Sequence, residues 1–140
     1  MKKTTIIFSF IMILILAGCG FLDSSQEVIL KGTSWKLVSY DGKFPIEGRE
    51  ITAIFTGAEI SGSAGCNHYF GSYKVKGDEI TIEGLGWTEM ACLDPDGIME
   101  QEVIVMMMFS RAEKINRRNG TLEIQTSLGE ILLFEMTSSD

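Results

Sequence analysis

Apolar and polar residues alternate along most of the chain with a period of two, which is typical of half-buried β-strands. The alternation is clearest in residues 33–40 and 49–56. Further strands are predicted at residues 71–76, 79–83, 112–117, 121–126 and 130–136. Turn signals, of which Asn119-Gly120 is the strongest, recur at intervals of roughly eight to twelve residues. This spacing favours an all-β meander, sandwich or barrel.

One segment departs from the alternation. Acidic residues open it, and an unbroken apolar run from Val103 to Phe109 follows. Acids in a first turn complement the helix dipole, and Asp94-Pro95 supplies a cap candidate ahead of them. The sequence therefore predicts one α-helix near residues 96–110, largely buried because apolar residues cover every face. Its three consecutive methionines are interpreted as core packing, with an adaptable ligand-binding face as the alternative.

The amino terminus has the layout of a secretory signal. Lys2 and Lys3 precede an apolar run over residues 6–16, which is too short to span a bilayer. The sequence Leu16-Ala-Gly-Cys19 resembles the lipobox of bacterial lipoproteins. That resemblance implies a signal peptide over residues 1–18, lipidation of Cys19 and anchoring of the exported protein in the cell envelope. An ordinary signal peptide with an incidental cysteine is the alternative.

Charge narrows the choice of partners. The whole chain has 12 basic and 19 acidic residues, and loss of residues 1–18 leaves 10 and 19, a net charge of −9. An acidic body argues against nucleic acid as a partner and against electrostatic attachment to anionic lipid. The expected contact with the membrane is therefore the lipid on Cys19, with polar residues 19–30 as a tether.

The cysteines offer three interpretations. With Cys19 lipidated, Cys66 and Cys92 remain as an even pair in a compartment that permits disulfides, and a disulfide is the favoured interpretation. Cys66 with His68 is a thiol and imidazole pair for an exported thiol enzyme, but oxidation would remove the nucleophile. A metal site from Cys66, His68 and Cys92 lacks a fourth ligand and the short cysteine spacings of zinc sites. We predict no catalytic residue, metal or cofactor.

Five aromatic residues near the centre of the chain either fill a small core or line a pocket in a barrel mouth, and core filling is favoured: Trp35, Tyr69, Phe70, Tyr73 and Trp87. Three of them fall within Ser61–Tyr73 beside the only histidine and several glycines, and this density predicts a shaped turn.

Three motifs then occur in order. They are Gly32-Thr-Ser-Trp35, Ser61-Gly-Ser-Ala-Gly-Cys-Asn67 and Trp87-Thr-Glu-Met-Ala-Cys92. Together they resemble the META (HslJ-like) domain over residues 31–137. The resemblance implies a mainly β fold, a small lipocalin-like antiparallel β-barrel with one packed helix, often carried by envelope lipoproteins of the stress response and without established catalytic activity. The family signature falls on Gly65, Cys66, Asn67, Gly71, Thr88, Met90 and Cys92.

These observations predict a non-catalytic, lipid-anchored envelope protein whose META-like domain is a binding or interaction module in stress tolerance. Its partner is an unidentified protein, or, in the alternative, a small apolar ligand carried or sensed inside the barrel. Asn67 is expected to take left-handed backbone angles in the turn that holds Cys66, and Met90 to pack beside the sulfur bridge. His68 is left without a role.

Overall fold

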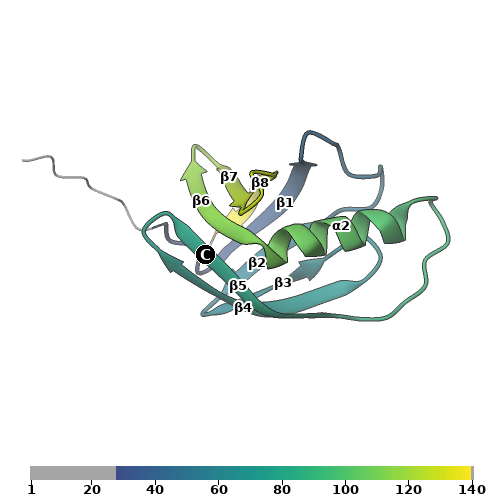
Figure 1. Cartoon of the computed structure of the whole chain (residues 1–140), viewed down its shortest axis with the longest axis horizontal. Helices are drawn as coiled ribbons and strands as arrows, with labels where there is room; N and C mark the ends of the chain where they lie inside the picture. Colours follow the sequence, from purple (N-terminus) through teal and green to yellow (C-terminus); the bar gives the residue numbers. More distant parts are fainter. Residues whose placement is uncertain (1–27, 140) are drawn as a thin grey trace, which may run out of the picture.

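The computed structural model describes residues 28–139, which form a closed antiparallel barrel of eight strands with one helix packed on it (Figure 1). The predicted fold is therefore confirmed. The signal peptide, Cys19 and most of the tether lie outside the described residues. The elements are β1 (Thr33–Tyr40), β2 (Thr52–Thr56), β3 (Glu59–Ser63), β4 (His68–Lys76), β5 (Glu79–Trp87), α2 (Ile98–Ser110), β6 (Ala112–Arg118), β7 (Thr121–Thr126) and β8 (Ile131–Ser139).

The strands follow one another around the barrel in sequence order, and β1 closes it by pairing with both β2 and β8. The seam between β5 and β6 is short. Its register is a single pair, Glu79 with Lys114, beside a backbone hydrogen bond of 2.8 Å from Ile115 N–H to the Asp78 carbonyl. Beyond this pair the two strands separate, and α2 lies along the opening (Figure 1).

Side chains fill the inside of the barrel. The largest fully buried ones include Trp35, Phe55 and Tyr69. From the last turn of α2, Phe109 enters the same core, with its ring centroid 5.3 Å from that of Tyr69 and 6.0 Å from that of Phe134. Of the five aromatic residues assigned to the core, Trp35, Tyr69 and Tyr73 are buried, whereas Phe70 and Trp87 are exposed.

Helix α2 departs from its prediction in two respects. It begins at Ile98 after Gly97, whose φ of 83° marks a left-handed N-cap without a side-chain cap, so the cap predicted at Asp94 is wrong. Nor is the helix buried all round, because Met99, Val103 and Met107 are 36%, 49% and 44% exposed. A helix lying along a seam buries only the face it turns to the barrel. The other face remains apolar and in contact with solvent.

The glycine-rich stretch is a β-hairpin, and the predicted shaped turn is only its tip. Strand β3 was missed by the sequence analysis, since Gly and Ser are poor strand formers. Gly62 is required there because a Cβ at this position would lie 2.1 Å from the Thr52 carbonyl oxygen. Gly65, with a φ of 107°, turns the chain toward β4.

The end of the expected tether packs against the barrel. Leu30 is buried in the core, and the Arg117 guanidinium donates a hydrogen bond to the Ile29 carbonyl while lying 5.4 Å from the Trp35 ring centroid. Val28–Leu30 has no strand conformation. Within residues 28–139, no helix has the length and apolar character needed to cross a bilayer.

Candidate functional site

The tip of the β3–β4 hairpin brings the family-signature residues together around Asn67, which is 1% exposed. The Asn67 side-chain oxygen accepts hydrogen bonds of 2.7 Å from the Thr88 hydroxyl and from the Met90 N–H. Its Nδ2 donates to the Met90 carbonyl at 3.2 Å. One side chain thus fastens the segment that follows β5 to the hairpin, as a strand partner would.

Asn67 also binds the helix. Its backbone N–H and its Nδ2 donate to the two carboxylate oxygens of Glu102, each at 2.7 Å. Glu102 is 1% exposed, so these bonds offset the loss of water around a buried carboxylate. The sequence analysis placed Glu102 among the acidic residues that open the helical segment and gave it no partner. Helical spacing places it on the face of Ile98, Val105 and Phe109, which is the signal that would have found it.

The two cysteines belong to the same cluster. Their sulfur atoms lie at disulfide distance and their Cα atoms 6.0 Å apart, so the pair joins the hairpin to the segment after β5. The Cys66 sulfur is therefore placed against Cys92, and His68 beside it is exposed with its side chain outside the cluster. Within the described residues, no group of three His, Cys, Asp or Glu side chains forms a metal-binding cluster.

One expected role is corrected. Asn67 does not adopt left-handed backbone angles, because Gly65 supplies the positive φ of this turn. The Met90 side chain is half exposed, and its backbone N–H and carbonyl make the contacts with Asn67. Thr88 lies just beyond β5 and contributes its hydroxyl, which donates to Asn67. The signature therefore acts through hydrogen bonds that position a loop.

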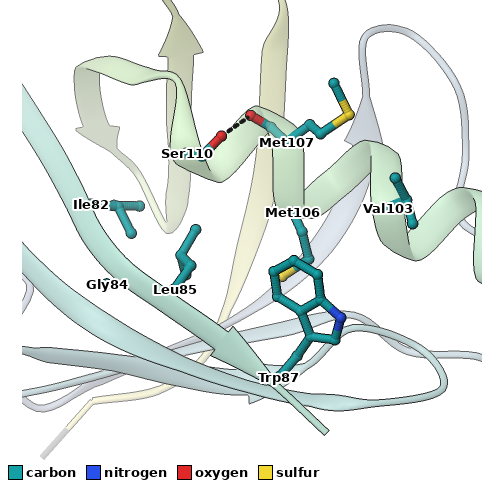
Figure 2. A pocket seen from close by; sticks show the side chains of 8 residues that line it. All are labelled: Ile82, Gly84, Leu85, Trp87, Val103, Met106, Met107 and Ser110. Carbon is teal, nitrogen blue, oxygen red and sulfur yellow. Dashed lines mark hydrogen bonds between the residues drawn. The ribbon is translucent and has the colours of Figure 1, made fainter. Parts of the chain in front are cut away.

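Beside this cluster, a groove of about 400 Å³ runs between β5 and α2. Figure 2 shows Leu85 and Trp87 on β5 and, across from them, Val103, Met106 and Met107 on the helix. Trp87 is 44% exposed, although its neighbour Thr88 is tied to the buried cluster. The cluster and the groove are therefore continuous through Trp87 and Thr88.

A family model described as "META domain" matches residues 28–139. The chain belongs to the META domain family. The match begins at Val28, within the segment that packs against the barrel core. Against curated proteins, no sequence matches.

Three solved structures share the fold of this META domain. An NMR structure of a protein from Burkholderia xenovorans has 26% identity and a TM-score of 0.66, covering 82% of this chain and 87% of that one. A second NMR structure has 25% identity and a TM-score of 0.63, over 76% and 91% of the two chains. A crystal structure of a DUF4847 family protein from Bacteroides vulgatus has 12% identity and a TM-score of 0.56, over 80% and 97%, and shows the fold alone.

In this META domain, the polar cluster is structural in character. Every polar atom of the Asn67 side chain is already bonded within the domain. The Cys66 sulfur faces Cys92 and so does not offer a thiolate beside a base. The groove, in contrast, presents exposed apolar side chains, which are those of Trp87, Val103 and Met107.

Proposed function

We propose that this protein is a lipid-anchored component of the bacterial envelope, whose META domain is a non-catalytic binding module acting in stress tolerance. The groove between β5 and α2 is its binding site. Lipid on Cys19 holds the protein at the membrane, and residues 20–27 separate that lipid from the domain.

The exposed apolar face of α2 supports this proposal most directly. Met99, Val103 and Met107 follow one another at intervals of four residues along the solvent side of the helix. A surface helix of a monomeric domain normally carries polar residues there, and contiguous apolar surface marks a binding site. Methionine side chains suit such a surface because they adapt to the shape of what they contact.

The packing of the barrel interior favours the groove over that interior as the site for an apolar ligand. The interior holds packed aromatic rings, including Phe109 from the helix itself. A ligand inside the barrel would have to displace them, and removing one such ring costs about 3–5 kcal/mol. A ligand in the groove displaces only solvent.

Binding in the groove is tested with a neutral, environment-sensitive dye such as Nile red, added to the full chain carrying Cys19→Ser. We expect the dye to bind this chain and to bind the double variant Val103→Ser, Met107→Ser roughly tenfold less tightly, because each serine removes apolar contact area. Leu128→Ser, at an exposed apolar position in the β7–β8 turn, is the matched control. Equal affinity in all three chains would overturn the groove as the binding site.

Lipid anchoring is tested by cell fractionation. The unaltered chain is expected in the membrane fraction and Cys19→Ser in the exported, unanchored fraction. Cys66→Ser serves as a control for loss of any cysteine. A Cys19→Ser chain that stays fully membrane-associated would contradict the anchor.

A further inference from the structure

We infer that the groove between β5 and α2 receives a cationic amphipathic helix, with the apolar side of that helix against Trp87, Val103 and Met107. This inference rests on the proposed function and names the chemistry of its partner. It combines the apolar lining of the groove with the sign of the charges around it.

The helix that forms one wall carries only negative charge. Within Ile98–Ser110 the charged residues are Glu100 and Glu102, and the segment contains no lysine or arginine. Glu102 is committed to Asn67 inside the domain. Glu100 is exposed in the first turn, next to Met99 on the apolar face.

The other wall continues this pattern. Glu89 follows Trp87 by two positions and is exposed, whereas Glu83 in β5 is exposed but paired with Lys74. Past the end of α2, Glu113 is exposed at the start of β6. In the sequence, exposed carboxylates therefore flank both ends of the apolar walls. None of the described residues that line the groove is charged.

Three cations of the neighbouring elements lie close to carboxylates of the domain itself. The Arg111 guanidinium, directly after α2, lies 4.0 Å from the Glu130 carboxylate. Lys74 lies 3.4 Å from Glu83, and Lys114 lies 3.4 Å from Asp78. The mature chain as a whole has a net charge of −9 by residue count. An apolar partner with its own positive charges is attracted to such a site, whereas an acidic partner is repelled.

A helix fits this groove better than an added strand. Strand addition needs a regular, open edge, but β5 is interrupted beside the groove by Gly84, whose φ is 62° at a register irregularity. The groove presents apolar side chains of α2 and the ring of Trp87. An amphipathic helix binds a surface of this kind through its own apolar residues at positions i, i+4 and i+7.

The test uses Trp87 as a reporter. Trp35 is fully buried and Trp87 is 44% exposed in the groove, so a ligand there alters the emission of Trp87. The probe is a Leu/Lys peptide of about 18 residues, five helical turns, patterned as an amphipathic helix and free of aromatic residues. A Leu/Glu peptide of the same pattern and a scrambled Leu/Lys peptide are the controls, all titrated into the full chain with Cys19→Ser.

We expect the Leu/Lys peptide to shift the tryptophan emission to the blue, and both control peptides to bind at least roughly tenfold less tightly. Val103→Ser with Met107→Ser should weaken binding by about tenfold, and Glu89→Gln with Glu100→Gln by about threefold, with a smaller dependence on salt. Leu128→Ser should leave it unchanged. Circular dichroism confirms that each variant is folded.

Equal binding of the Leu/Lys and Leu/Glu peptides would overturn the charge selection, and equal binding of the scrambled peptide would overturn the helical partner. Binding that survives the Val103 and Met107 changes would place the peptide elsewhere and overturn the site. If the neutral dye binds in the groove and no peptide does, this inference fails and the proposed function stands. If neither binds, both fail.

Discussion

Asn67 and Glu102 form two hydrogen bonds with each other, each 2.7 Å long, across 35 positions of sequence. Both residues are 1% exposed, one at the tip of the β3–β4 hairpin and one on the core side of α2. A carboxylate in such a place needs donors, and Asn67 supplies both. Because Asn67 also holds the segment after Trp87, this pair connects the helix, the hairpin and the wall of the groove.

Replacing Glu102 by Gln should therefore destabilise the domain by about 2 kcal/mol, since the new amide group faces a donor of Asn67. Glu100→Gln on the same helix changes an exposed side chain and should cost less than about 0.5 kcal/mol. Urea denaturation of the two variants measures the difference. Equal unfolding free energies for the two variants would show that the hydrogen bonds between Glu102 and Asn67 do not stabilise the fold.

The Cys66 and Cys92 pair, separated by 26 positions, should stabilise the fold by about 3 kcal/mol if it is bonded in cells. The double variant Cys66→Ser, Cys92→Ser is expected to lose that amount in denaturation experiments. Thiol titration of the denatured, unreduced Cys19→Ser chain should detect no free thiol. Two free thiols per chain would contradict the disulfide.

Gly62 and Gly86 give a matched pair of substitutions. A Cβ at Gly62 would lie 2.1 Å from a backbone oxygen, whereas a Cβ at Gly86 would lie 2.9 Å from the tip of the exposed Phe70 ring, which can move away. Gly62→Ala should thus lower the free energy of unfolding by about 3 kcal/mol, and Gly86→Ala should lower it by less than about 1 kcal/mol. Thermal denaturation compares them, and a similar melting temperature for both would refute the close approach of β2 and β3.

Stability should fall in alkaline solution through Tyr69. Burial raises the pKa of this phenol above its ordinary value of 10.0, and its hydroxyl donates to the Thr52 carbonyl at 2.7 Å. Because the unfolded chain releases this proton first, stability declines as pH rises above about 10. Tyr69→Phe should cost about 1 kcal/mol at pH 7 from the lost hydrogen bond, and its stability should fall less steeply above pH 10.

Denaturation curves between pH 7 and pH 11 provide the measurement. The two chains should approach one another in stability at the alkaline end. Burial raises the pKa of Tyr73 as well, so a shallower alkaline slope remains in the variant. Parallel curves at all pH values would exclude Tyr69 as the source of the alkaline loss.

Much of the barrel could be predicted from alternation alone. Residues 33–40 and 121–126 form strands with the predicted bounds, since buried positions alternate along β7 and along β1 as far as the irregularity after Leu37. The prediction missed β3, where glycine and serine replace the apolar marks of a strand because β2 approaches closely at Gly62. Backbone proximity of this kind depends on how the two strands pair and leaves no periodic signal in the sequence.

The candidate site was predictable only in part. The signature located Asn67 and the cysteine pair, but the partner of Asn67, Glu102, was hidden among the acidic residues that open the helical segment. The exposed face of α2 was only the alternative to core packing, because a continuous apolar run indicates burial and does not say how much surface the barrel offers. At the short β5–β6 seam the barrel buries only one face of α2. The exposure of the other face could be seen only in the folded structure.

The central claim, that the groove binds an apolar molecule, is tested most directly by NMR of methionine methyl groups in the full Cys19→Ser chain. Met106 and Met107 line the groove, with 2% and 44% of their surface exposed, whereas the buried Met108 does not line it. On addition of the neutral dye, we predict concentration-dependent shifts of the Met106 and Met107 methyl signals with Met108 little changed. Unchanged Met106 and Met107 signals at saturating dye would contradict the account.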